Sequence, residues 1–71
     1  MEFTEFPQGY FRSIGYDELE KQLHVRLEDE RYLIFYEVDQ IDYVGLMSSN
    51  DMQAFFHGRI EDRYPARTIT N

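Results

Sequence analysis

The sequence predicts an α+β fold, a three-stranded antiparallel β-meander followed by two helices packed on one face. In the first half of the chain, segments with the residue types and the apolar–polar alternation of β-strands lie between short polar segments. After Val38 the apolar residues recur every three or four positions, which is typical of helices. The chain has 71 residues, which suits one domain with a single two-layered core.

The domain is expected to span residues 10–67. Residues 1–9 precede it as an N-terminal arm, and residues 68–71 follow it as a C-terminal tail. The arm shows no clean periodicity, but Phe3 and Phe6 are too apolar for a purely solvated segment. We therefore expect the arm to pack on the domain.

The first two strands are predicted from side-chain type and alternation. Residues 10–17 are rich in aromatic and β-branched side chains, and residues 17–21 form a polar connection of hairpin length. Gln22 to Leu27 alternates polar and apolar residues without a slip, which predicts one buried and one solvated face. Connections of only a few residues imply antiparallel neighbours.

The third strand is predicted at residues 32–38. It is apolar on both faces, as in a central strand or one covered on both sides. The turn before it holds Glu28, Asp29 and Glu30, which could bind a hard cation. Three adjacent acids lack the spaced ligands of a calcium loop, so a solvated turn is favoured.

Two helices are predicted after the strands. Ile41, Val44 and Met47 are three residues apart and indicate a short first helix. Asn50, with Gln53 three positions later, resembles the capping box that starts a second helix. Pro65 ends that helix, and its apolar stripe consists of Met52, Phe55, Phe56, Ile60 and Tyr64.

Composition excludes several classes of site and location. Acidic residues number 14 against 7 basic ones, and a net charge of −7 disfavours autonomous binding to nucleic acid. Cysteine is absent and only two histidines are present, which argues against a structural zinc site. The chain has no apolar run of membrane-spanning length and no basic start typical of a signal peptide. We expect a cytoplasmic protein with no cofactor and no membrane association.

Several short motifs share one register along the chain. They are Ile14-Gly15-Tyr16-Asp17, Leu23-x-Val25-x-Leu27, Val38, Tyr43, Phe55-Phe56-His57, Ile60 and Tyr64. In this order the chain resembles the KTSC domain, a small domain related to the C-terminal extension of some lysyl-tRNA synthetases. That family also occurs as free-standing bacterial and phage-type proteins. The resemblance covers roughly residues 11–65 and implies that RNA binding, which has been suggested for the family, is a candidate function.

The chain departs from the family pattern mainly at polar positions. The family's Tyr-x-Tyr pair on the third strand falls on Leu33 and Phe35, which lack both hydroxyl groups. A glycine of the preceding turn is replaced by Glu30, and the proline after Val38 by Asp39. Other replacements are His57 for the asparagine after Phe56, and Gln8 and Gly9 for the serines before the first strand. This member therefore lacks candidate RNA contacts.

Three residues of the second helix are the candidate binding residues. Because the apolar stripe faces the core, the outer face carries Arg59, Arg63 and His57. The arginines could grip phosphate or a partner's carboxylate, or simply pair with nearby acids such as Glu61. His57 could serve as an acid or base, but a lone histidine without a paired nucleophile is more often structural.

The aromatic residues of the third strand allow two interpretations, and the sequence lacks known catalytic motifs. Tyr32, Phe35 and Tyr36 could form a stacking platform for single-stranded nucleic acid, but packing in and over the sheet is favoured. The chain contains no phosphate-binding glycine loop, nucleophile elbow or metalloprotease motif. The sequence therefore predicts no catalytic residues, no metal site and no evident small-molecule substrate. It favours a non-enzymatic interaction module that binds a protein partner, with an RNA-binding accessory domain as the alternative.

Overall fold

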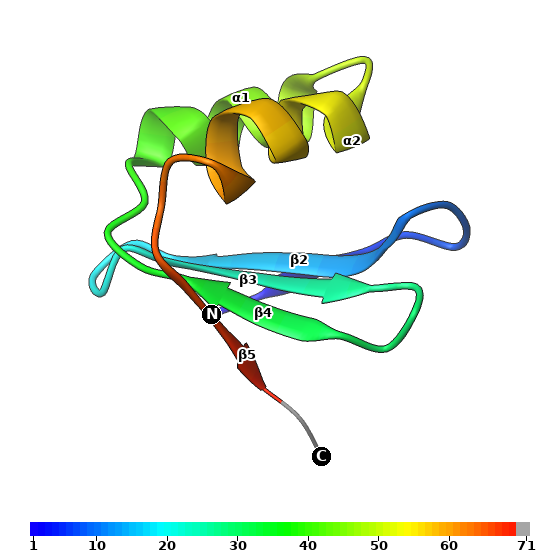
Figure 1. The fold of residues 1–71 in the computed structure, drawn as a ribbon, viewed down its shortest axis with the longest axis horizontal. Coiled ribbons are helices and arrows are strands. Elements are labelled where there is room, and N and C mark those ends of the chain that lie inside the picture. Colours follow the sequence, from blue (N-terminus) through cyan, green and yellow to red (C-terminus); the bar gives the residue numbers. More distant parts are fainter. Residues whose placement is uncertain (70–71) are drawn as a thin grey trace.

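The structure, a computed structural model, describes residues 1–69 and consists of a sheet covered on one face by a helical layer (Figure 1). The strands lie in the order β1-β2-β3-β4-β5, and all neighbouring pairs are antiparallel. The helical segments fall between the last two strands. The elements are β1 (Phe3–Glu5), β2 (Phe11–Asp17), β3 (Gln22–Leu27), β4 (Tyr32–Phe35), α1 (Gln40–Ser48), α2 (Met52–Phe55), the π-helical segment η1 (Phe56–Glu61) and β5 (Ala66–Ile69).

The α+β class is confirmed, but the prediction of three strands was wrong because the sheet has five. The two additional strands are short edge strands from the ends of the described chain. β1 pairs with β2, and β5 pairs with β4. With three and four residues, neither is long enough to show its own alternation. Their register comes from the longer neighbouring strands. The last residues of the expected C-terminal tail, 70 and 71, lie outside the described residues.

The alternation of β3 is confirmed on its core face, but the other face is not fully solvated, because His24 is only 9% exposed. Leu23, Val25 and Leu27 are at most 1% exposed and face the helices. The turn before this strand is built by Asp17, whose Oδ1 accepts hydrogen bonds from the backbone N–H groups of Leu19 and Glu20. Such a turn fixes the register of the hairpin between β2 and β3.

The third predicted strand ends earlier than expected. β4 stops at Phe35, and the backbone N–H of Tyr36 donates instead to the carbonyl of Pro65. Glu37 adopts a left-handed conformation, with φ at 59°, which cannot continue a strand. Because β5 pairs with β4, the expectation that this strand is central is confirmed.

The second helix starts one residue later than the sequence suggests. Its N-cap is Asp51, whose Oδ1 accepts a hydrogen bond from the N–H of Ala54, so the capping box predicted at Asn50 is wrong. The helical segment then continues through η1 and stops before Pro65. α1 approaches α2 closely at Gly45, where an added Cβ would lie 2.6 Å from Cζ of Phe55.

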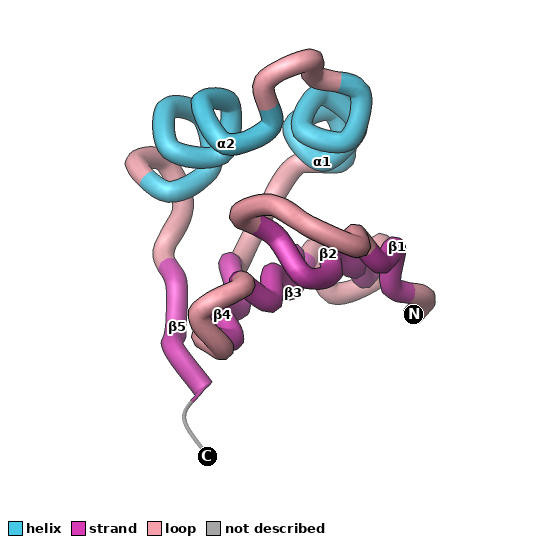
Figure 2. The backbone as a smooth tube through the Cα atoms, turned by 90° about the vertical axis from the view of Figure 1, so that its right-hand side faces the viewer, coloured by secondary structure: helices cyan, strands magenta, loops and turns pink. Residues whose placement is uncertain are grey.

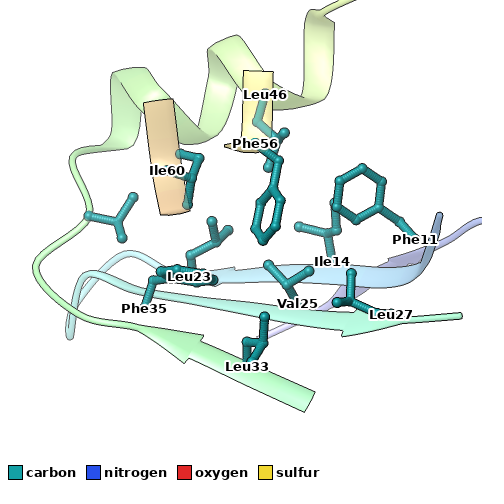
Figure 3. Packing of buried hydrophobic residues seen from close by; sticks show 11 residues of the cluster. Phe11, Ile14, Leu23, Val25, Leu27, Leu33, Phe35, Leu46, Phe56 and Ile60 are labelled. Atoms are coloured by element: carbon teal, nitrogen blue, oxygen red, sulfur yellow. The ribbon is translucent and has the colours of Figure 1, made fainter. Parts of the chain in front are cut away.

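The core lies between the helices and the sheet, and Phe56 projects into its centre (Figure 3). The Phe56 ring makes edge-to-face contacts with Phe11 and Phe35, with centroid distances of 5.4 and 5.5 Å. Phe56 and Ile60 are fully buried, which confirms the predicted inner stripe at these two positions. In residues 1–69, no helix has the length and apolar character needed to cross a membrane.

Candidate functional site

The three candidate residues lie on η1 or just after it. Arg59 and Arg63 are exposed, whereas His57 is half-buried. Nδ1 of His57 lies 2.9 Å from Oε1 of Glu61, four residues along the chain. The His57 ring also packs edge-on against Tyr10, with centroids 5.4 Å apart. His57 therefore joins the helical layer to the segment before β2.

Both arginines lie against aromatic rings that contact α1. Cζ of Arg59 is 5.7 Å from the centroid of the Phe55 ring, and Phe55 fills the space beside Gly45 of α1. Cζ of Arg63 is 5.9 Å from the centroid of the Tyr64 ring. Each guanidinium thus gains a cation–π contact and keeps its planar edge exposed.

Helix α1 presents apolar side chains to solvent and buries an acid. Ile41 and Val44 are 77% and 52% exposed, whereas Asp42 is only 8% exposed. The hydroxyl group of Tyr64 donates a hydrogen bond to Oδ2 of Asp42, which provides the buried carboxylate with a partner. Burial, reinforced by this hydrogen bond, raises the pKa of Tyr64. The apolar spacing located the helix correctly, but Ile41 and Val44 point outward, whereas Met47 packs against the core.

We define the helical surface as four exposed side chains of this layer together with the half-buried ring of Phe55, which also packs against the core. The apolar residues come from α1 and the end of α2, and the charged ones from η1 and the turn after it. The helical surface consists of Ile41, Val44, Phe55, Arg59 and Arg63.

The described helices leave the opposite face of the sheet uncovered (Figure 2). Two rows of residues cross the strands on this face. We call it the open sheet face. Strand register and alternation place one residue of each strand in each row. The first row is Glu5, Ser13, Arg26, Tyr32 and Ile69, and the second is Phe3, Gly15, His24, Ile34 and Arg67.

His24 is the most buried ionisable group of the open sheet face. Its Nε2–H donates to Oε1 of Gln22 over 3.2 Å, and its Nδ1 lies 2.7 Å from the hydroxyl of Tyr32. The ring of Phe3 packs edge-on against it, at a centroid distance of 6.1 Å. Desolvation by this burial lowers the pKa of His24, although Asp17 acts in the opposite direction.

Tyr32, Phe35 and Tyr36, the possible stacking platform, do not form one surface. Phe35 lies in the core at 1% exposure, which confirms the packing reading for this residue. Tyr36 follows the end of β4, and only Tyr32 belongs to the open sheet face. The expected Tyr-x-Tyr positions, Leu33 and Phe35, both face the core.

The acidic turn between β3 and β4 interacts with arginines. Oε1 of Glu28 lies 3.6 Å from a terminal nitrogen of Arg12, and Oδ2 of Asp29 lies 2.9 Å from Nε of Arg31. All four side chains are about half exposed. In the part of the chain that the structure describes, no group of three histidine or acidic side chains is placed to hold a metal ion.

Comparison with known proteins agrees with this architecture. The model of the KTSC domain matches residues 9–64, most of the chain. The chain belongs to the KTSC domain family. The crystal structure of a KTSC domain protein from Yersinia pestis has the same fold, with a TM-score of 0.87 and 23% sequence identity over 97% of each chain. No curated protein matches the sequence. The positive φ of 72° at Glu30 agrees with its place at the turn glycine of KTSC domains.

Proposed function

We propose that this KTSC domain is a non-enzymatic interaction module that binds a protein partner through the helical surface. The outward orientation of Ile41 and Val44 on α1 carries the proposal, because the same helix buries Asp42. The exposed side chains of Ile41 and Val44 leave apolar surface in contact with water, and binding of a partner would remove this surface from water.

The charges beside this apolar area indicate the chemistry of the partner. Arg59 lies over Phe55, and Arg63 lies over Tyr64, so both are held near α1 with their donors exposed. Arginine binds carboxylates in a planar, bidentate geometry and is a common anchor of protein interfaces. The partner would place an apolar side chain on Ile41 and Val44 and a carboxylate on one of the arginines.

The test compares two double variants with the same change of charge. Arg59→Glu combined with Arg63→Glu alters the helical surface, and Arg26→Glu combined with Arg67→Glu alters the open sheet face. Partners recovered from the native source are identified by mass spectrometry, and their binding is then measured with purified proteins. The first variant is expected to lose the partner and the second to keep it, with circular dichroism as the folding control. Equal binding by both variants would contradict the proposal.

RNA binding by the open sheet face is the second candidate function. This candidate is supported by the pairing of Tyr32 with Arg26, because Cζ of Arg26 lies 5.7 Å from the centroid of the Tyr32 ring. Arg67 lies on the same face of the sheet. Aromatic and arginine side chains on a sheet are suited to stacked bases and phosphates. The net charge of −7 opposes this function.

We expect the affinity for generic single-stranded RNA to be weak at a salt concentration of about 0.15 M. Fluorescence anisotropy with a labelled oligoribonucleotide measures it. Submicromolar binding that Arg26→Glu combined with Arg67→Glu abolishes would place RNA ahead of a protein partner. In that case the variant of Arg59 and Arg63 should bind RNA as the wild type does.

A further inference from the structure

A cavity of about 140 Å³ lies where the turn between β3 and β4 meets the sheet. Three of the chain's six arginines line it, although the protein as a whole is strongly acidic. Its volume is well below the 300–1,000 Å³ or so that encloses a drug-sized ligand. It can therefore hold one small ionic group, with the rest of a ligand outside. The lining residues are Arg12, Arg26, Leu27, Glu30, Arg31 and Tyr32.

Each arginine reaches the cavity from a different element. The register of β2 against β3 shifts between Phe11 and Ser13, and Arg12 is the extra residue of this bulge. Bulges of this kind redirect a side chain and are frequent beside binding sites. Arg26 comes from β3, opposite Tyr32 of β4.

Two of these arginines are held by carboxylates outside the lining. Asp29 accepts from both Nε and the backbone N–H of Arg31, at 2.9 and 3.1 Å. Because Nε is the bonded atom, the two terminal nitrogens of Arg31 stay available as donors. Arg12 contacts Glu28 at 3.6 Å through one terminal nitrogen. Because these acids already orient the two arginine side chains, binding of a ligand costs less side-chain entropy.

Arg26 differs from the other two arginines. Within residues 1–69 it has no carboxylate within ion-pair distance, and its recorded contact is with the ring of Tyr32. Ser13 lies directly opposite Arg26 in the strand pair and is 2% exposed. Its hydroxyl group has no hydrogen-bond partner among the described residues. An unpaired cation and an unpaired buried hydroxyl therefore lie next to each other at this point of the sheet.

From this geometry we infer that the cavity binds a phosphate monoester group. Three positive charges and the negative charge of Glu30 line it. Glu28 and Asp29 pair with Arg12 and Arg31 from outside the lining, so Arg26 is the arginine of the cavity that has no carboxylate partner within residues 1–69. Planar guanidinium groups match the oxygen atoms of phosphate, and several arginines around one anion are a recurrent form of phosphate recognition. The site is separate from the helical surface and does not depend on the proposed partner.

The test follows backbone and arginine side-chain NMR signals of the whole chain during titration with inorganic phosphate. Saturable shifts are expected at the cavity residues, and Arg26→Ala should weaken binding at least about tenfold. Arg67→Ala is the matched control, because Arg67 lies on the same face but not at the cavity. Glu30→Gln should strengthen binding by removing the opposing charge. Shifts that do not saturate, or that Arg26→Ala leaves unchanged, would overturn the inference.

Two further ligands distinguish the source of the phosphate. Adenosine 5′-monophosphate represents a small phosphorylated metabolite, and a phosphoserine peptide represents a modified protein. Either should bind at least as tightly as inorganic phosphate and perturb the same signals, and the tighter one identifies the source. Acetate should bind about tenfold more weakly, because it carries one charge instead of two. Binding of inorganic phosphate but of neither monoester would mean an adventitious ion only and would overturn the proposal.

Discussion

The hydroxyl group of Tyr64 donates a hydrogen bond to the carboxylate of Asp42, and this contact ties the turn after η1 to the first turn of α1. The two residues are 22 positions apart in the chain. Asp42 is 8% exposed, so its carboxylate depends on protein donors for hydrogen bonding. The contact therefore bears on how the helical layer is held together.

Replacement of Tyr64 by Phe should lower the free energy of unfolding by about 1.5–3 kcal/mol, the range for a hydrogen bond to a charged group. The loss leaves a buried carboxylate without its partner. Urea denaturation measures it. Tyr43→Phe is the matched control and should be nearly neutral, because the Tyr43 hydroxyl forms no hydrogen bond within residues 1–69. Equal effects of the two variants would show that the Tyr64 contact contributes little.

Replacement of Phe56 by Ala should destabilise the domain by about 3–5 kcal/mol, because it removes a fully buried ring at the centre of the core. A thermal melt monitored by circular dichroism tests this. Phe56→Leu keeps most of the volume and should cost less than about 1.5 kcal/mol. A melting temperature unchanged by the alanine variant would contradict the packing described for Phe56.

The two glycines of the helical layer should respond to alanine in opposite directions. At Gly45 a Cβ would lie 2.6 Å from the ring of Phe55, so Gly45→Ala should destabilise the domain by about 1–3 kcal/mol. At Gly58 a Cβ would meet no atom within 4 Å, so Gly58→Ala should stabilise it by about 1 kcal/mol through helix propensity. Chemical denaturation of both variants decides the signs.

Glu30→Gly should stabilise the domain by about 1 kcal/mol, because Glu30 has a φ of 72° that glycine adopts without strain. Glu30→Ala separates backbone strain from charge, since alanine removes the carboxylate but keeps the Cβ. We expect stabilisation by glycine and little gain from alanine, measured by urea unfolding. If alanine stabilises as much as glycine, the effect comes from the charge.

His24 should make folding dependent on pH. Burial lowers its pKa below the ordinary value of 6.5, so the unfolded chain binds the proton more tightly than the folded one. Stability is therefore fully present above pH 6.5 and decreases as the pH falls from 6.5 through the folded-state pKa. The free energy of unfolding is compared between wild type and His24→Gln from pH 5 to 8, so that shared contributions cancel. A difference that does not vary with pH would refute the assignment.

The sequence predicts best those elements that are long enough to show a periodic arrangement of apolar residues. β3 has the predicted bounds, because Leu23, Val25 and Leu27 alternate with polar residues. The strands β1 and β5 are defined by pairing with their neighbours, and a segment of three or four residues holds no such information. The turn that contains Glu30 was predicted from its polar residues, and the family resemblance places Glu30 at a glycine position, which agrees with its left-handed backbone.

The surfaces were harder to predict than the fold. Periodicity gave the position of α1 but not which side faces the sheet, because the partner of Asp42 is Tyr64, far along the chain. The arginine cavity combines β2, β3 and the turn before β4, and one of its residues arrives there through a bulge. A single sequence carries no signal for such convergence. Arg59 and Arg63 lie exposed as expected, but the aromatic rings beneath them were not predicted.

The order of the strands also bears on how the chain folds. β1 to β4 pair in the order in which they occur, so each of these hairpins closes a short loop and can form quickly. The β4–β5 ladder joins Phe35 to Ala66, on the far side of the helical segments. Closing this long loop has the largest entropic cost of the sheet. The meander of β1 to β4 is therefore expected to form first, and β5 can pair with β4 only after the helices have docked. In pulsed hydrogen exchange, the amide groups of β5 should accordingly become protected late.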